Sequence, residues 1–363
     1  MQSERLGSVV KQRAAGHHRL RSLGTWGVSL LPLALPFAAF MRATPASAQS
    51  GASCRSVEID AELTLGLVRG EVAGTLCVPP GATTVQLLLH GFSYGQYYWD
   101  IPFEPETYSF VRDANARGFA TLNIDRLGNV GSFQPLSAFV TMDAQASVVH
   151  QVVEALRDGS LGVGFENVVL VGHSSGSLIA YIEAGRFQDV DALVATGASH
   201  ELNAVNIATR VIGQSAPAIL DPKFAALLLD PGYVTTLPGR RGTFYELDDV
   251  EPEIVALDEQ LKQTSTLEEA VTTLPDAILN ISRNINLPVL AVNGELEPFF
   301  CNGLLAGDCS SSEALRESER PFYGPNAEVD AIVVPGAGHN VTLELDAPAT
   351  NAAIQDWIED QGF

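Results

Sequence analysis

The chain has 363 residues, of which 46% are hydrophobic and 18% are charged, and its formal net charge is −22. A chain of this length and apolar content can bury a large core. Its acidic surface repels phosphate groups, which argues against binding to nucleic acid or to anionic membranes and favours solubility.

The N-terminal segment has the pattern of an export signal. Basic residues, among them Lys11 and Arg21, precede an apolar stretch at 26–41, and an Ala-Ser-Ala triplet follows as a cleavage site. The apolar stretch is shorter than the roughly 20 residues of a membrane span and contains two prolines. We therefore predict a signal peptide at 1–48, a mature domain at 49–363, and a secreted or extracytoplasmic protein without stable membrane association.

The mature chain is expected to begin with a hairpin that carries a disulfide. Segments 56–65 and 71–78 are typical of paired strands, and two cysteines flank this region. An even number of cysteines in an exported chain favours disulfides, so we predict the local bridges Cys54–Cys77 and Cys301–Cys309. Because no Cys-x-x-Cys pair or histidine cluster accompanies the cysteines, we expect no metal site and no cofactor.

An apolar run at 85–89 predicts a buried strand, and His90-Gly91-Phe92 follows it directly. We interpret this turn as an oxyanion loop in which the backbone N–H of Phe92 is a candidate donor. Aromatic residues cluster just after the turn, where they either line an acyl pocket or pack a cap against the core. The residues assigned to substrate binding are Tyr94, Tyr98 and Trp99, together with His173.

The rest of the chain alternates between apolar runs and amphipathic segments. Further strands are predicted at 120–124, 167–171, 192–195, 289–292 and 331–334, and helices at 108–117, 143–157 and 177–186. Continuous apolar runs are typical of strands covered on both faces, so we predict an α/β fold with a mostly parallel central sheet and helices on both faces. The interval at about 200–286 is too long for a simple connection and predicts a helical cap insertion over the active site.

The most informative stretch joins the strand at 167–171 to the next helix. It reads Gly172-His173-Ser174-Ser175-Gly176, a Gly-x-Ser-x-Gly sequence. A serine can be held out on a sharp strand-to-helix turn only if the residues two before and two after it have almost no side chain. Ser174 is therefore the candidate nucleophile. The helix that begins there aims backbone N–H groups, including that of Ser175, at the position of a developing oxyanion.

A serine hydroxyl is a poor nucleophile until a positioned base takes its proton, so the candidate partner is a histidine. The chain has seven histidines. His339 stands in a glycine-containing loop after the predicted strand at 331–334, where its imidazole could reach over the sheet edge. His200 is a less well-placed alternative, and His150 lies within the predicted helix at 143–157.

The third member should be a carboxylate that orients the imidazole and stabilises its protonated form. In the order serine, acid, histidine it falls between Ser174 and His339, at the end of a strand. Glu297, in the turn after the strand at 289–292, is the first choice. Glu295 competes in the same loop, and Glu201 is a third candidate.

Five motifs, in this order along the chain, resemble those of the α/β-hydrolase superfamily over most of the mature chain apart from about 200–285. They are His90-Gly91-Phe92, Asp125-Arg126-Leu127-Gly128 with Gly131-Ser132, Gly172 to Gly176, Gly294-Glu295-Leu296-Glu297-Pro298, and Gly338-His339. The chain departs from the family pattern in carrying glutamate where aspartate is more usual, and in the displacement of one glycine by Asn129 and Val130. The resemblance implies a secreted serine hydrolase of the esterase or lipase type.

The predicted reaction is hydrolysis of a small-molecule carboxylic ester. His339 takes the proton of Ser174, Glu297 holds the imidazole, and the N–H groups of Phe92 and Ser175 stabilise the oxyanion. Few basic residues lie near these motifs, so we expect an uncharged or apolar substrate. Peptidase, lactonase or amidase activity on the same machinery is the alternative, and a non-catalytic binding protein with the hydrolase fold is the alternative of a different class.

Overall fold

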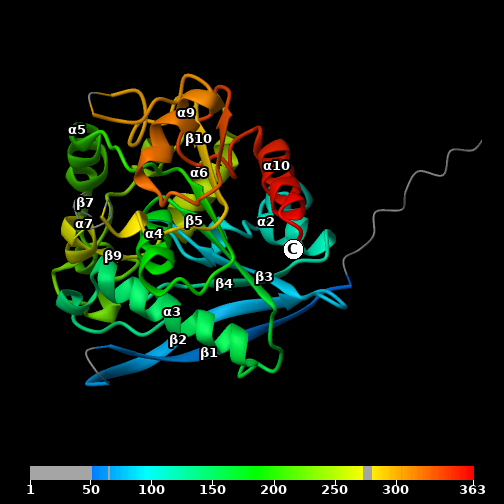
Figure 1. Cartoon of the computed structure of the whole chain (residues 1–363). Coiled ribbons are helices and arrows are strands. Elements are labelled where there is room, and N and C mark those ends of the chain that lie inside the picture. Colours follow the sequence, from blue (N-terminus) through cyan, green and yellow to red (C-terminus); the bar gives the residue numbers. More distant parts are fainter. Residues whose placement is uncertain (1–50, 64–65, 273–279, 304) are drawn as a thin grey trace, which may run out of the picture. The chain divides into compact units, whose positions relative to one another are not determined.

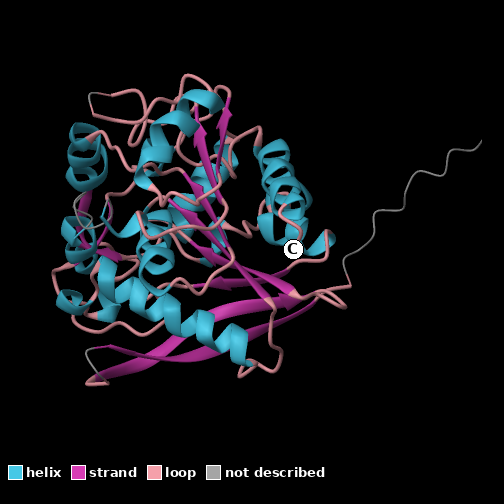
Figure 2. Cartoon of the chain, in the orientation of Figure 1, coloured by secondary structure: helices cyan, strands magenta, loops and turns pink. Residues whose placement is uncertain are grey.

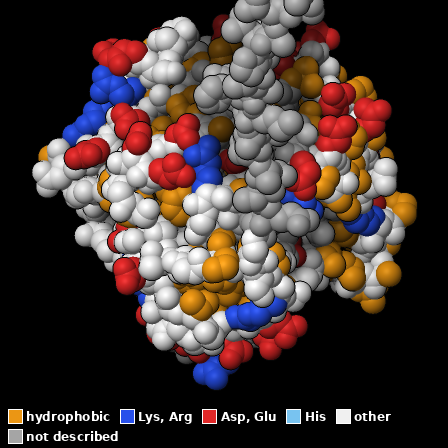
Figure 3. Space-filling view, turned by 90° about the vertical axis from the view of Figure 1, so that its right-hand side faces the viewer, with side chains coloured by type: hydrophobic (Ala, Val, Ile, Leu, Met, Phe, Trp, Pro, Cys, Tyr) orange, Lys and Arg blue, Asp and Glu red, His pale blue; other side chains and the backbone are white. Residues whose placement is uncertain are grey.

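The computed structural model describes residues 51–63, 66–272, 280–303 and 305–363 (Figure 1). The predicted signal peptide at 1–48 lies outside these residues. Among the described helices, none is both long and apolar enough to cross a membrane. Acidic side chains are spread over the face shown in Figure 3, in keeping with the net charge of −22.

An eight-stranded sheet forms the centre of the fold, with the order β1-β2-β4-β3-β5-β6-β10-β11. Only the β1–β2 and β2–β4 pairs are antiparallel, and the other five neighbouring pairs are parallel. The predicted mostly parallel α/β sheet is confirmed. The strands are β1 (Ser53–Leu63), β2 (Val68–Val78), β3 (Thr84–Leu89), β4 (Ala120–Ile124), β5 (Asn167–His173), β6 (Ala192–Thr196), β10 (Val289–Gly294) and β11 (Val329–Val334).

Helices cover both faces of this sheet, as Figure 2 shows. Helices α3 and α4 pack against each other, α2 packs against α10, and the two pairs lie on opposite sides of the strands in Figure 1. The main helices are α1 (Pro105–Tyr108), α2 (Phe110–Ala116), α3 (Met142–Asp158), α4 (Ser175–Phe187), α9 (Ser312–Glu319) and α10 (Ala347–Asp360). This arrangement confirms the prediction of helices on both faces.

Local sequence explains why α3 begins and ends where it does. The Thr141 hydroxyl accepts a hydrogen bond from the Ala144 N–H at 3.2 Å, which caps the first turn. The helix ends at Gly159, whose φ of 77° lies in the left-handed region that glycine adopts without strain. Between these caps, a stripe that includes Val149 and Val153 is buried, so one face of the helix covers the sheet.

The strand register brings the predicted site segments to one edge of the sheet. Leu89 at the end of β3 lies opposite Gly172 near the end of β5, and Gly294 at the end of β10 lies opposite Val334 at the end of β11. Because these strands are parallel, the loops that follow them all emerge at their carboxyl ends. The His90 turn, the Gly-x-Ser-x-Gly turn, the acid loop and the histidine loop therefore meet there.

The insertion at about 200–286 contains helices and, in addition, strands that the sequence analysis did not predict. It contains an antiparallel sheet of β7 (Ser215–Pro217), β8 (Tyr233–Thr236) and β9 (Ser265–Thr266). Strands of two to four residues are too short to show an alternating pattern in the sequence. The described helices of this region are α5 (Ala204–Asn206), α6 (Pro252–Leu261) and α7 (Leu267–Thr272), and Ala225–Leu227 forms only a 3₁₀ turn.

Short irregular helices occupy the connections. Seven are 3₁₀ turns, namely η1 (Gln96–Tyr98), η2 (Ser137–Phe139), η4 (Ile212–Gln214), η5 (Ala218–Leu220), η6 (Ala225–Leu227), η7 (Arg241–Phe244) and η8 (Arg320–Phe322), and η3 (Ile207–Val211) is a π-helix. Helices of the π type are rare. Two side chains of η3, Ile207 and Val211, line the cavity described below.

Both predicted disulfides are present. Cys54 and Cys77 are direct partners in the register of β1 and β2, and their sulfurs are bonded. Cys301 and Cys309 form the second bridge, in the loop after β10, and no cysteine is free. The first bridge fixes the register of the terminal hairpin, and the second closes a loop beside the candidate acid.

Replacing Cys54 and Cys77 together by serine should lower the free energy of unfolding by about 3 kcal/mol, because the bridge removes conformational freedom from the unfolded chain. The two residues are 23 positions apart. Denaturant unfolding of the variant and the parent protein, followed by circular dichroism, measures the difference. An unchanged unfolding free energy would show that strand pairing alone fixes this hairpin.

Candidate active site

Ser174 sits at the junction of β5 and α4 in a strained backbone conformation. Its φ is 54° and its ψ is −121°, values that a residue with a side chain rarely adopts. A Cβ atom added to Gly172 would lie 2.5 Å from the backbone of Ser177, and one added to Gly176 would lie 2.3 Å from the carbonyl oxygen of Leu89. Only glycine fits at both positions, so the strand and helix can approach closely enough to hold the serine out from the turn.

His339 and Glu297 form a buried pair. Nδ1 of His339 lies 2.7 Å from Oε2 of Glu297, and each residue is 1% exposed. The other carboxylate oxygen of Glu297 accepts the backbone N–H of Phe299 at 2.7 Å, which fixes the orientation of the carboxylate. The Phe299 ring also contacts the imidazole edge-on, with 4.9 Å between ring centroids. Because Nδ1 faces the carboxylate, Nε2 is the nitrogen left to exchange a proton.

Ser174 and His339 line the same cavity, together with Phe92 and Ser175. The remaining lining side chains are apolar: Leu178, Ile207, Val211, Ile212, Phe244, Ala270, Phe299 and Phe300. Within the described chain the Ser174 hydroxyl makes no hydrogen bond to His339. Catalytic hydrogen bonds are often long in the absence of substrate and tighten when it binds. The cavity thus brings a serine and a carboxylate-paired imidazole to one apolar space.

The backbone N–H groups of Phe92 and Ser175 are available at this cavity. Neither donates to an acceptor in the part of the chain that the structure describes. Ser175 is the first residue of α4, where the N–H has no partner within the helix. Both groups can therefore bind a negatively charged oxygen beside Ser174.

Arg126, a buried arginine that the sequence analysis did not single out, makes hydrogen bonds to the His90-Gly91-Phe92 turn. The Arg126 guanidinium donates to the Gly91 carbonyl oxygen at 3.2 Å and pairs with Glu269 at 2.5 Å. Its backbone N–H donates to Nε2 of His90 at 3.1 Å. Burial, and then the nearby Arg126 charge, lower the pKa of His90, so His90 is neutral and acts as an acceptor. Arg126 stands in the Asp-x-x-Gly motif, but its partner Glu269 lies 143 residues further along.

The four residues predicted to bind substrate do not line the cavity, which corrects that prediction. Tyr94, Tyr98, Trp99 and His173 are at most 1% exposed. The His173 imidazole stacks on Tyr98, with 4.1 Å between centroids, and its Nε2 lies 3.0 Å from Oδ1 of Asn340. These aromatic side chains point into the core, so the packing role weighed for them in the sequence is the one that the structure supports.

Asn340, which follows His339 directly, connects the histidine loop to a buried polar network under the cap. Its amide donates to the Tyr94 hydroxyl at 2.7 Å, and that hydroxyl donates to Asp258 at 3.1 Å. Asp258 on α6 also pairs with Arg241 at 2.9 Å, and neither side chain is exposed. The loop that carries the histidine is therefore held through hydrogen bonds to the cap.

The alternative candidates for the acid and the base do not take part in the His339–Glu297 pair. Glu295 is exposed and accepts the backbone N–H of Gly336 at 2.9 Å. His200 is buried against Glu319, with 2.7 Å between Nδ1 and Oε2. Among the described residues, Glu201 makes no contact with the imidazole of His339. Of the candidates, only Glu297 orients His339.

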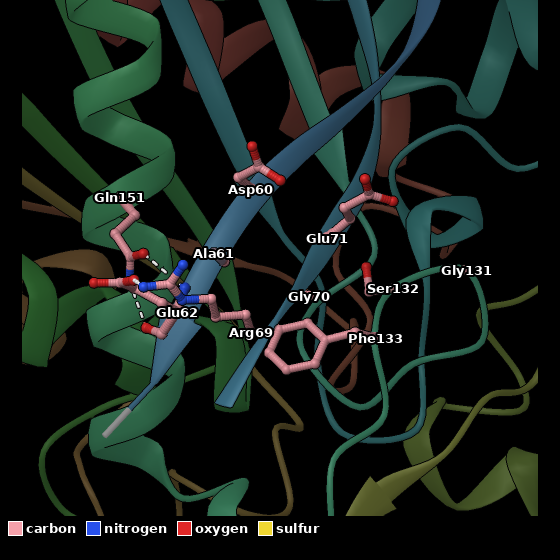
Figure 4. A pocket seen from close by; sticks show the side chains of 10 residues that line it. All are labelled: Asp60, Ala61, Glu62, Arg69, Gly70, Glu71, Gly131, Ser132, Phe133 and Gln151. Carbon is pink, nitrogen blue, oxygen red and sulfur yellow. Dashed lines mark hydrogen bonds and ion pairs between the residues drawn. The ribbon is translucent and has the colours of Figure 1, made fainter. Parts of the chain in front are cut away.

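A second hollow lies beside β1 and β2 and is shown in Figure 4. Its lining is mostly polar and includes Arg69 and Glu62, which pair at 3.4 Å with both side chains largely exposed. Gln151 of α3 accepts the backbone N–H of Glu62 at 2.9 Å. The residues around this hollow include no histidine. It therefore lacks a base of the kind found beside Ser174.

Three solved structures share this fold at low sequence identity. DcsB in complex with its substrate analogue is 16% identical with a TM-score of 0.57, covering 85% of this chain and 99% of that one. Carboxylesterase CesB from Bacillus subtilis is 18% identical with a TM-score of 0.54, covering 85% and 93%. The enol-lactonase from Burkholderia xenovorans LB400 is 14% identical with a TM-score of 0.53, covering 80% and 97%. At these identities the likeness shows the fold alone.

A comparison with curated proteins found no match. The chain does match the alpha/beta hydrolase family over residues 86–353. This match runs from β3 into α10 and includes the Gly-x-Ser-x-Gly turn, the acid loop and the histidine loop. By that match and by its sheet order, the chain belongs to the alpha/beta hydrolase family.

Proposed function

We propose that the chain is a secreted serine hydrolase that cleaves a carboxylic ester through an acyl-enzyme. The observation that carries this proposal is the buried His339–Glu297 pair, 2.7 Å apart, at the same cavity as the strained Ser174. A carboxylate-paired imidazole beside a serine at a strand-to-helix turn is the arrangement that serine acyl transfer requires.

In the proposed reaction, the hydroxyl oxygen of Ser174 attacks the ester carbonyl carbon while Nε2 of His339 takes its proton. The N–H groups of Phe92 and Ser175 donate to the oxyanion of the tetrahedral intermediate. The intermediate expels the alcohol, which receives the proton from His339, and an acyl-serine ester remains. Water then attacks this ester with the same imidazole as base, which releases the acid and restores the serine hydroxyl. Glu297 stabilises the imidazolium of His339 in both acylation and deacylation.

The cavity favours an uncharged substrate with an apolar acyl group. Among the described residues, its lining side chains other than Ser174, Ser175 and His339 are all apolar and include no arginine or lysine. A buried carboxylate or phosphate on the substrate would therefore have no cationic partner there, which is costly. The names of similar structures include a carboxylesterase and an enol-lactonase, and both activities suit this machinery. The two disulfides are compatible with the proposed location outside the cytoplasm.

The purified protein should hydrolyse uncharged p-nitrophenyl esters, and a fluorophosphonate probe should label it covalently. Ser174→Ala should abolish both, because the variant lacks the hydroxyl that the strained turn holds out beside the paired imidazole, while its circular dichroism spectrum stays unchanged. The same assays include lactones, aminoacyl amides and esters of increasing acyl length, which separates esterase from lactonase, amidase or peptidase activity. Undiminished labelling of the alanine variant would overturn the nucleophile, and complete inactivity of the parent protein would favour a binding protein.

Glu297→Gln should lower kcat by two or more orders of magnitude, since the imidazolium loses its charged partner. Glu295→Gln is the matched control, because it makes the same chemical change two residues away on an exposed side chain, and its kcat should stay within about twofold of the parent value. Steady-state kinetics on one ester compares the two. The reverse result would transfer the acid role to Glu295.

The Cys301–Cys309 bridge should matter more for turnover than for stability. Cys301 follows Phe299 and Phe300, which contact the imidazole of His339, so the bridge restrains the loop that carries the acid. It spans only 8 residues, so its effect on chain entropy is small. Replacing both cysteines by serine should lower kcat several-fold with a small fall in Tm.

The Cys54–Cys77 double serine variant is the control for this prediction, because its bridge lies on the terminal hairpin. It should show the opposite balance, with a larger fall in Tm and an unchanged kcat. Equal effects of the two double variants on kcat would contradict the proposed division of roles.

A further inference from the structure

Three side chains from α3, from α4 and from the turn after α4 converge near the C-terminal end of α4. His150 lies on α3, Glu183 lies near the end of α4, and Asp189 follows that helix. Nδ1 of His150 lies 2.7 Å from Oδ2 of Asp189 and 4.0 Å from Oε1 of Glu183. One nitrogen and two carboxylate oxygens are thus all within 4.8 Å of one another.

Among the described residues, the buried carboxylate of Glu183 has no hydrogen-bond partner. Its side chain is 0% exposed, and neither of its oxygens has a hydrogen-bond donor. Oδ1 of Asp189 is also buried without a donor. A buried anion without a partner carries a large desolvation cost, and burial together with Asp189 raises the pKa of Glu183 to about 10. These acceptor atoms all surround one point.

We propose that His150, Glu183 and Asp189 bind a divalent transition-metal ion of the Zn²⁺ type. Ligands placed about 2.1 Å from such an ion stand about 3.4 Å apart in a tetrahedron, a spacing that small side-chain shifts reach from the observed one. An imidazole nitrogen with two carboxylate oxygens suits Zn²⁺, whereas Ca²⁺ takes six to eight oxygen ligands. The two carboxylates offset the charge of a divalent ion, and water takes the fourth position.

The surroundings leave the cluster free for a cation. The Arg157 guanidinium donates to the Asp189 carbonyl oxygen and to the Asp191 carboxylate, and its charge lowers the pKa of Glu183 less than burial raises it. The Phe187 ring stacks on the His150 imidazole, with 3.8 Å between centroids, and fixes its plane. On the opposite side of the imidazole, Nε2 lies 3.7 Å from Glu154, a carboxylate that would orient a metal-binding imidazole.

A bound ion would join α3 to the end of α4, the helix that begins directly after Ser174. It would replace the His150–Asp189 hydrogen bond by two metal–ligand bonds and add a third to Glu183. A proton shared between the two carboxylates could satisfy the same atoms, so the test has to separate a metal from a proton. This site does not depend on the proposed ester hydrolysis.

The experiment uses the full chain, made without an affinity tag and stripped of metal with a chelator. Isothermal titration with ZnCl₂ should give one saturable site that is absent or at least tenfold weaker in Glu183→Gln. Saturating Zn²⁺ should raise the Tm of the parent protein and leave that of the variant unchanged. Glu183→Gln removes one carboxylate ligand while keeping the size of the buried side chain, so it should fold, and Asp189→Asn provides a second variant with the same expected loss.

The matched control is Glu319→Gln, which makes the same change at the buried His200–Glu319 pair. That variant should bind Zn²⁺ as tightly as the parent protein. Absence of saturable Zn²⁺ binding by the parent protein would overturn the site. So would binding by Glu183→Gln and Asp189→Asn that is as tight as that of the parent protein. A proton shared between the two carboxylates would then account for the buried acceptor atoms. Binding of CaCl₂ in place of ZnCl₂ under the same conditions would overturn the assignment of the ion.

Discussion

The close approach of β5 and α4 at the Gly-x-Ser-x-Gly turn is the constraint on which the rest of the site depends. Ser174 adopts its strained backbone because its N–H donates to the Thr196 carbonyl oxygen at 2.8 Å and the strands on both sides are buried. A parallel sheet covered on both faces cannot relax locally, so it can bear strain that an exposed loop would release. The other parts of the site are loops placed at the carboxyl ends of the same strands.

The cap is tied to this edge by buried polar groups. Asp258 accepts hydrogen bonds from Tyr94, Tyr97 and Tyr245 in addition to the pair with Arg241. A buried ion pair adds little stability by itself, but removing one partner leaves an uncompensated charge, so such networks specify one arrangement. This network of buried hydrogen bonds extends to the loop of His339 through Asn340, which donates to the Tyr94 hydroxyl. The cap and the loop of His339 are therefore joined by one continuous chain of buried hydrogen bonds.

The parts of the fold that the sequence predicted are those encoded by local signals. Continuous apolar runs marked the parallel strands, glycine spacing marked the turn at Ser174, and the end of the strand at 289–292 marked the loop that carries both Glu295 and Glu297. Tyr94 and its neighbours were misplaced because closeness to the His90 turn in sequence does not say which way a side chain points. The Arg126–Glu269 pair and the cluster around Glu183 join residues far apart in the chain, and no local pattern reveals such contacts.

Three imidazoles lie near the Ser174 turn, and their surroundings make them unequal. His90 and His173 hydrogen-bond only to neutral groups, and burial lowers the pKa of each, with the Arg126 charge adding to the effect at His90 and His339 at His173. His339 alone among the three has a carboxylate within 2.7 Å. In the proposed reaction His339 is therefore the imidazole that takes the proton of Ser174, because it lines the same cavity and faces a carboxylate, whereas His90 and His173 do neither. Access to the cavity, together with the position of Glu297, selects the base.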